Sequence, residues 1–160
     1  RTFHEYFNPD RDMPMEAERV HGLSAAFLSD KPRFPEKVEA LLEFLGDDPL
    51  VAHNAQFDFG FLNFELGLCG YDSIGEDRMI DTLVLARRRH PGAKHSLDAL
   101  CGRLGVVIPP ALRHTAMGDA VATAEVFLKM LSMLKGQGVE TFGDVLAEMR
   151  RHRRLLEDLN

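Results

Sequence analysis

Apolar residues recur along this chain with the spacings that distinguish helices from short buried strands. Short segments of strand-type composition, bounded by turn-forming residues, predict strands at 2–7, 49–54 and 78–81. Apolar residues three or four positions apart predict helices at 34–45, 56–67, 82–89 and 97–105, within 111–136, and at 141–160. The first of these helices has the expected end signals, with Pro35 early and Gly46 after its end. Strands interleaved with helices predict an α/β fold.

The size and composition indicate one ordinary globular domain. The 160 residues, 45% apolar and 28% charged, fit a single domain over 1–160 with a sizeable core. No apolar run approaches the roughly 18 residues of a membrane span, and two cysteines make no disulfide framework, so we expect a cytoplasmic protein. The net charge of −6 argues against a protein that coats nucleic acid by charge alone. It is compatible with metal ions held by acidic ligands.

The segment LRHTAMGDAVATAEVF, residues 112–127, combines a histidine with an acid at the start of an alanine-rich helix. Five residues at ~100° each would separate His114 from Asp119 if both lay in the helix. Their side chains can converge only if His114 precedes the helix and Asp119 lies within it. A carboxylate on the packed side of a helix needs a cation or hydrogen-bond donors. The segment therefore predicts chemistry at these two residues.

A second candidate lies in the stretch VAHNAQFDFGFL, where a strand passes into a helix. Asn54 is a favoured N-cap, and Asp58 then projects from the first turn, where the positive end of the helix dipole favours an anion. One interpretation is that Asp58 only complements this dipole at the surface. The neighbouring Phe57, Phe59 and Phe61 favour the other interpretation, in which the turn is largely buried and Asp58 serves a site.

Together the two stretches resemble nuclease motifs. HNAQFD and HTAMGD are similar to the second and third motifs of the DnaQ-like 3′→5′ exonucleases, called DEDDh for their four acids and one histidine. MPMEAERVHGLS and MIDTLVLARRRHPGAKHSLDALCGRLGV resemble the segments before the second motif and between the second and third. The resemblance spans about residues 1–135 and is closest to the proofreading epsilon subunits of bacterial DNA polymerase III. It implies a ribonuclease H-like α/β fold, with a mixed central sheet flanked by helices.

The resemblance also implies metal-dependent release of nucleoside monophosphates from DNA 3′ ends, in proofreading or repair. Phosphodiester hydrolysis suits two divalent ions ~3.5–4 Å apart, and hard oxygen ligands suit Mg²⁺ or Mn²⁺. Asp58 and Asp119 are the implied metal ligands, and neutral His114 is the implied base for the attacking water. Glu16 and His21 match positions that contact the terminal nucleotide. The implied partners are a single-stranded DNA 3′ end and a DNA polymerase catalytic subunit.

The first motif of this family, an Asp-x-Glu on the first strand, is absent from the sequence. Asp10 and Asp12 lie in a turn with no following Thr-Gly loop, so they do not replace it. The sheet of the family has the strand order 3-2-1-4-5, in which residues 2–7 resemble strand 3 and residues 50–52 resemble strand 4. We therefore expect strands 1 and 2 to precede Arg1 in a longer exonuclease, and the 160 residues alone to be inactive.

Several alternatives stay open from the sequence alone. His21 and the residues up to Ser24 can form a turn and a helix cap without contacting a substrate. His53 and Asn54 suit capping or supporting roles, and Asp81 suits a strand end or an N-cap. The same fold serves exoribonucleases, and a chain without the first acids can also be an inactive module that binds nucleic acid or protein. Metal-dependent release of mononucleotides from matched DNA and RNA strands separates these functions.

Overall fold

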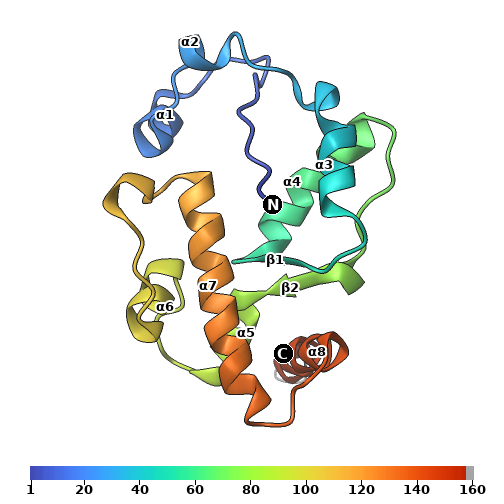
Figure 1. The fold of residues 1–160 in the computed structure, drawn as a ribbon, viewed down its shortest axis with the longest axis vertical. Helices are drawn as coiled ribbons and strands as arrows, with labels where there is room; N and C mark the ends of the chain where they lie inside the picture. Colours follow the sequence, from blue (N-terminus) through green and yellow to red (C-terminus); the bar gives the residue numbers. More distant parts are fainter. Residues whose placement is uncertain (158–160) are drawn as a thin grey trace. The chain divides into compact units, whose positions relative to one another are not determined.

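The computed structural model describes residues 1–157, which divide into two compact units (Figure 1). The first unit is formed by Arg1–Asp48 and Phe61–Ser73, and the second by Pro49–Gly60 and Ile74–Asn160. Helix α4 (Ala55–Leu68) contributes to both units. No helix in the described part of the chain is both long and apolar enough to cross a membrane.

The first unit is built from short helices joined by tight turns. They are α1 (Met15–His21), α2 (Ala25–Leu28), the 3₁₀ turn η1 (Phe34–Glu36), α3 (Val38–Leu45) and the later part of α4. Gly22 ends α1 in the left-handed region, at φ 72°, where a glycine has no Cβ to clash. The hydroxyl oxygen of Ser24 then accepts a hydrogen bond from the Phe27 N–H at 3.1 Å and so begins α2.

The predicted strand over residues 2–7 is wrong. This segment has no regular secondary structure, and its aromatic rings pack instead on the first unit, with Phe3 against Phe44 and Phe7 against Phe34 at centroid distances of 5.8 and 5.5 Å. A strand exists only where a neighbouring strand takes up its N–H and C=O groups. Among the described residues no such neighbour pairs with this segment.

The second unit contains the sheet. Strands β1 (Leu50–Ala52) and β2 (Met79–Asp81) pair in parallel, with Leu50 opposite Met79 and Ala52 opposite Asp81. Within residues 1–157 the sheet consists of these two strands, so the described part of the expected mixed sheet is a parallel pair. Parallel strands require a crossover connection, and the chain between β1 and β2 includes α4. The strands predicted over 49–54 and 78–81 are confirmed with shorter bounds.

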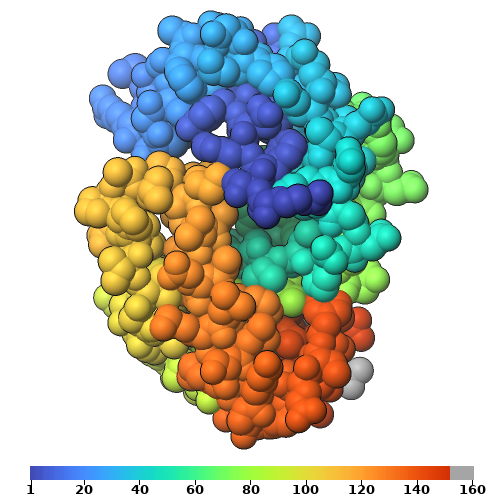
Figure 2. All heavy atoms as spheres, in the orientation of Figure 1, coloured from blue at the N-terminus to red at the C-terminus, as the bar shows by residue number. Residues whose placement is uncertain are grey.

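Helices pack around this strand pair and bury the core of the second unit. They are α5 (Thr82–Arg89), α6 (Leu97–Leu104), α7 (Ala116–Lys135) and α8 (Phe142–Glu157), with the 3₁₀ turns η2 (Glu76–Arg78) and η3 (Pro110–Leu112). Helix α7 contacts β1, α5 and α6, whereas α8 contacts β2 and α5. Figure 2 shows that side chains fill the space between α7 and α8 that the ribbon leaves open. The core includes Ile80, Leu85, Leu100, Val126, Met130 and Val145.

The predicted helices are confirmed, with small shifts at their ends. The first begins as the 3₁₀ turn η1 before α3, and α4 continues to Leu68, so Gly67 does not end it. Gly70, at φ 80°, follows instead. Ser96 caps α6, and Gly136 follows α7. The helix expected over 141–160 runs from Phe142 to Glu157, and residues 158–160 lie outside the described residues.

Candidate active site

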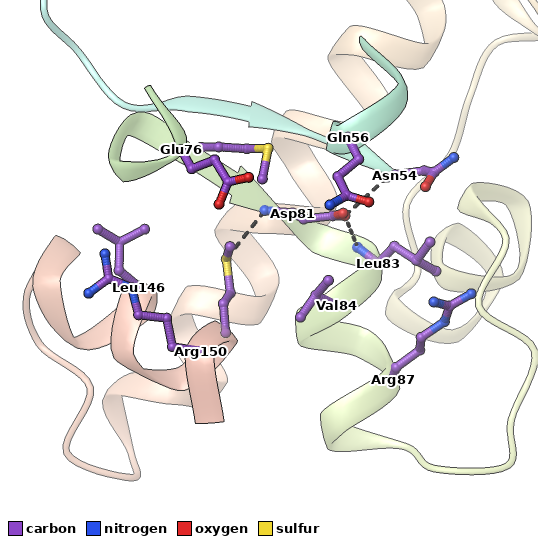
Figure 3. A pocket seen from close by; sticks show the side chains of 11 residues that line it. Asn54, Gln56, Glu76, Asp81, Leu83, Val84, Arg87, Leu146 and Arg150 are labelled. Carbon is purple, nitrogen blue, oxygen red and sulfur yellow. Dashed lines mark hydrogen bonds between the residues drawn. The ribbon is translucent and has the colours of Figure 1, made fainter. Parts of the chain in front are cut away.

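The buried carboxylate of Asp81 joins the end of the sheet to the start of two helices. One oxygen accepts hydrogen bonds from the N–H groups of Asn54 at 3.0 Å and Leu83 at 2.8 Å (Figure 3). The other oxygen accepts one from Ala55 N–H at 3.0 Å. Asp81 is only 4% exposed, so these donors satisfy an anion that would otherwise be costly to bury. The predicted N-cap role is confirmed for α5, and the same side chain also fixes the start of α4.

Asp58 lies in the first turn of α4, as the sequence predicts, but the turn is less buried than expected. Phe59 is buried, whereas Phe57 and Phe61 are 62% and 60% exposed. Asp58 is also exposed. Nearby protein atoms nevertheless desolvate its carboxylate in part. This desolvation raises the pKa of Asp58, and the charge of Asp81 raises it further, against the opposing effects of a backbone hydrogen bond and His53.

His53 follows the end of β1 and contacts the first residue of α5. Its Nδ1 lies 2.9 Å from the hydroxyl of Thr82, which in turn donates a hydrogen bond to the Ala52 carbonyl at 3.3 Å. Burial lowers the pKa of His53, and the charge of Asp81 opposes that shift. The contact with Thr82 is of the supporting kind that the sequence suggested for His53.

His114 and Asp119 occupy the arrangement that their spacing requires. Helix α7 begins at Ala116 with Thr115 as its N-cap, so His114 precedes the helix and Asp119 lies in the first turn. The Thr115 hydroxyl accepts a hydrogen bond from Gly118 N–H at 3.0 Å and donates one to the Leu112 carbonyl at 2.7 Å. Both His114 and Asp119 are exposed, and His114 has a φ of 61°. A histidine on a turn and an acid on a rigid helix are therefore brought to one end of α7.

Gly118 makes the close approach between this turn and α7 possible. Its α-carbon lies directly against the Leu112 backbone, and a Cβ added there would overlap the Leu112 carbonyl oxygen. Gly118 is buried and its φ is not positive. A glycine is therefore required because there is no room for a Cβ, and not because of the backbone conformation. The segment that includes His114 is thus packed on the first turn of α7.

The predicted nucleotide-contacting residues lie in the first unit, on α1. Glu16 is exposed in the first turn of that helix, and His21 is partly buried at its end. The Nδ1 atom of His21 accepts a hydrogen bond from Leu23 N–H at 3.0 Å, which fits the alternative role of a turn-forming residue. A contact of Glu16 and His21 with a terminal nucleotide stays a prediction.

The described residues do not form a complete divalent-metal centre. Among the side chains that the structure describes, those of residues 1–151, no three from His, Cys, Asp or Glu are arranged to hold a metal ion. Asp10 does not supply the missing carboxylate, because it lies in a turn at φ 53° and pairs with Arg33 at 3.1 Å. Two close divalent ions require bridging carboxylates to offset their repulsion, and Asp58 and Asp119 alone are too few. The chemistry of the donor set therefore fits a metal site only in part.

Comparison with known proteins places these features in a family. The sequence model of the RNase_T exonuclease family matches residues 1–127, so this chain belongs to that exonuclease family. It is similar to the DNA polymerase III subunit epsilon of Rickettsia conorii, with 47% identity over 134 residues, which cover 82% of this chain and 58% of that protein. The corresponding subunit of Salmonella typhimurium is 41% identical over 144 residues, 88% of this chain and 58% of that protein.

Two further similarities concern a longer relative and a solved structure. A DNA polymerase III subunit epsilon-like protein of Rhodobacter capsulatus is 43% identical over 160 residues, which are 99% of this chain but only 22% of that protein. The chain therefore spans between about a fifth and three fifths of the length of these relatives. The structure of Exonuclease X in complex with 5′ overhanging duplex DNA shares the fold, with a TM-score of 0.65, 29% identity, and coverage of 89% of this chain and 78% of that one.

The sequence could place three of these side chains but not the second contact of Asp81, which fixes the start of α4, the helix that carries Asp58. The spacing of HTAMGD and HNAQFD predicted the positions of His114, Asp119 and Asp58 on their elements. The double cap by Asp81 was missed, because it joins residues 26 and 27 positions apart. An acid at the end of the neighbouring parallel strand is the signal that could have indicated it.

Proposed function

We propose that this chain is the larger part of a 3′→5′ exonuclease domain that releases nucleoside monophosphates from DNA ends, in proofreading or repair. The observation that supports this most directly is the arrangement at α7, where His114 precedes the helix and Asp119 lies in its first turn. Membership of the RNase_T exonuclease family supports the reaction class. The DNA substrate is proposed because the similar proteins are named as subunits of a DNA polymerase and as an exonuclease in complex with DNA. The 3′→5′ direction is proposed from the resemblance of HNAQFD and HTAMGD to the DnaQ-like motifs.

In this proposal His114 is the general base. Its exposed imidazole, on a turn outside the helix, can take the proton from a water molecule that attacks the terminal phosphodiester. Asp119 belongs to the rigid first turn of α7 and is held to α7 by its own N–H bond to the Thr115 carbonyl at 2.9 Å. The base is therefore able to move while the acid stays fixed.

Asp58 and Asp119 are the proposed ligands of Mg²⁺ or Mn²⁺. Divalent ions would lower the negative charge around the phosphate and stabilise the leaving oxygen. Because the described residues lack a third carboxylate at the site, the proposal requires an Asp-x-Glu from outside these 160 residues to complete the ligand set. A DNA polymerase catalytic subunit is the proposed partner, since the similar proteins are named as subunits of DNA polymerase III.

The experiment is to measure mononucleotide release by the full-length protein from 3′-labelled single strands of DNA and RNA of the same sequence. Replacing Asp119 with Ala should lower DNA hydrolysis by more than about a hundredfold, because even outer-sphere residues of metal sites typically cost 10–100-fold. The thermal melt should stay cooperative. Glu125→Ala, which removes an exposed acid further along α7, is the matched control and should keep near-normal activity. Near-normal activity of Asp119→Ala would show that the proposed site is wrong, and preference for RNA would assign the substrate differently.

A further inference from the structure

A pocket of about 260 Å³ opens in the second unit between the start of α4, the end of β2, α5 and α8 (Figure 3). Its surface combines apolar side chains with amide, carboxylate and guanidinium groups. The pocket adjoins the candidate active site, because Asp81 lines it and also caps α4 at Ala55, three residues before Asp58. None of the roles proposed above accounts for this pocket.

Two arginines of the pocket differ from their neighbours in having no polar partner. Within the described residues, neither Arg87 of α5 nor Arg150 of α8 forms a hydrogen bond or an ion pair, although both line the pocket and are exposed. The adjacent arginines are all engaged: Arg88 pairs with Glu148 at 2.7 Å, Arg89 donates to Gln137 at 2.6 Å, and Arg151 pairs with Glu148 at 3.2 Å. Free guanidinium groups are well suited to bind phosphate oxygens.

The acids of the pocket leave these arginines available. The carboxylate of Asp81 already accepts hydrogen bonds from three backbone N–H groups, so its oxygens are occupied by the chain itself. Glu76 lines the pocket from η2. Figure 3 shows Arg87 and Arg150 projecting from α5 and α8 on opposite sides of the pocket, with Val84 between them. Two separate positive groups therefore flank one apolar surface.

The apolar surface and its polar rim have the chemistry of a nucleobase site. Val84, Leu146 and Met149 present aliphatic carbon and sulfur to the pocket, which suits the face of a flat ring. Gln56 presents an amide, which can accept and donate hydrogen bonds at a base edge. Positive charge on both sides of the base favours a nucleotide inside a strand, because such a nucleotide has a phosphate on each side.

We propose that this pocket binds one internal nucleotide of the substrate strand, with the base on the Val84 and Met149 surface and the two flanking phosphates at Arg87 and Arg150. The proposal rests on the exonuclease function proposed above, and it adds a binding site that is separate from His114 and Asp119. A free mononucleotide shares the chemistry of the ligand but has only one phosphate. Binding of a strand should therefore depend on both arginines, whereas binding of a mononucleotide should depend on one.

The test measures the affinity of the full-length protein for a single-stranded DNA oligonucleotide in EDTA, at several salt concentrations, so that no hydrolysis occurs. Arg87→Gln and Arg150→Gln should each weaken binding several-fold. Each should also reduce the slope of log K against log [salt] by about 0.7, the value for one phosphate contact on a single strand. Arg89→Gln and Arg151→Gln remove the same charge from the same helices outside the pocket, and they should leave the slope unchanged. Slopes of the two pocket variants equal to the wild type would overturn the proposal.

A second measurement locates the nucleotide and keeps the result independent of catalysis. Oligonucleotides with 2-aminopurine at successive positions from the 3′ end should show a fluorescence change at one internal position, and Arg87→Gln or Arg150→Gln should remove it. Deoxynucleoside monophosphate should compete only weakly. Tight mononucleotide binding that depends on one arginine alone would overturn the strand assignment. Hydrolysis in Mg²⁺ is measured separately, so a failure of the exonuclease proposal appears there, while a failure of the pocket appears in these binding data.

Discussion

At the scale of single residues, His114 stands out for its backbone conformation. Its φ of 61° lies in the left-handed region, which few residues other than glycine adopt, although histidine is among those enriched there. Such a conformation costs roughly 1–2 kcal/mol and persists only where the surroundings hold it. Here the hydrogen bond from the Thr115 hydroxyl to the Leu112 carbonyl, at 2.7 Å, closes the turn around His114. The backbone of His114 is therefore held by the residues on either side of it, while its exposed imidazole is able to move.

Replacing His114 with Ala should separate its role from that of the acids. Because a general base contributes about 10²–10⁴-fold to rate, turnover by the full-length protein should fall by that factor. The affinity for Mn²⁺, measured by calorimetry, should stay unchanged because the histidine acts on water. His90→Ala, at the end of α5 in the same unit, is the control and should keep both properties. Loss of Mn²⁺ binding in His114→Ala would identify His114 as a ligand and contradict the proposed mechanism.

Gly118→Ala tests whether packing positions His114. The added methyl group would overlap the Leu112 carbonyl oxygen, so the turn has to shift. Since a displacement of ~1 Å can cost about a hundredfold in rate, kcat should fall substantially while Mn²⁺ affinity is kept. Gly102→Ala in α6, where nothing lies within 4 Å of the new methyl group, should leave activity unchanged and raise the melting temperature slightly, because alanine favours helix. Full activity of Gly118→Ala would show that the turn does not depend on this contact.

Residue spacing predicted where Asp58, His114 and Asp119 lie, because each motif is local to one strand end or helix start. The burial of the turn at Asp58 was predicted less well. Phe57 and Phe61 are mostly exposed, since apolar composition alone does not tell which side of a helix meets the core. The dual contact of Asp81 is a tertiary feature and has no local signal.

At the scale of elements, α8 depends on a capping box at its start. The Asp144 carboxylate accepts hydrogen bonds from Thr141 N–H and the Thr141 hydroxyl, both at 2.8 Å, and from Glu140 N–H at 3.1 Å. In return the Thr141 hydroxyl accepts from Asp144 N–H at 3.2 Å. Thr141 and Asp144 have the i, i+3 spacing of a capping box in the sequence. This box begins the helix that supplies Leu146, Met149 and Arg150 to the pocket.

Asp144→Ala should lower the melting temperature at pH 7, and the difference should disappear in acid. The hydrogen bonds from Thr141 and Glu140 hold the pKa of Asp144 below its ordinary value. A lowered pKa in the folded state stabilises the protein above the ordinary value of 3.8, and this stabilisation is lost as pH falls through the lowered value. Thermal melts from pH 7 down to about pH 3 would measure it. Asp98→Ala, in the first turn of α6, is the control and should show a smaller effect. An equal difference at every pH would contradict the capping role.

The elements were predictable where their signals are local and wrong where they depend on a neighbour. Helix caps such as Ser96 and Thr141 lie within a few residues of the groups that they bind, so the sequence indicates them directly. The segment 2–7 has strand-type composition, but a strand also needs a partner, and the described residues supply none. Composition therefore identified an apolar segment and not its conformation.

At the scale of the whole molecule, α4 presents an apolar stripe to solvent. Phe57, Phe61, Phe64 and Leu68 follow one another at intervals of four, three and four residues, so they share one face of the helix, and each is at least 60% exposed. Burying such side chains is worth roughly 1.5–3 kcal/mol each, which makes this exposure costly. In addition, within residues 1–157 strand β1 pairs only with β2. Both features are those of a sheet whose central strands are absent.

We therefore expect that the 160 residues alone melt broadly and do not hydrolyse DNA with Mg²⁺. Adding an N-terminal segment with two strands and an Asp-x-Glu should pair the open edge of β1, cover the stripe on α4 and complete the carboxylates around Asp58 and Asp119. Thermal melts and mononucleotide release from a 3′-labelled single strand should both be measured on the two proteins. An extended protein whose Asp-x-Glu is changed to Asn-x-Gln should melt cooperatively but stay inactive, which separates folding from catalysis. If the 160 residues melt sharply and digest DNA unaided, the first motif has been misplaced, and Asp10 and Asp12 become the acids to test.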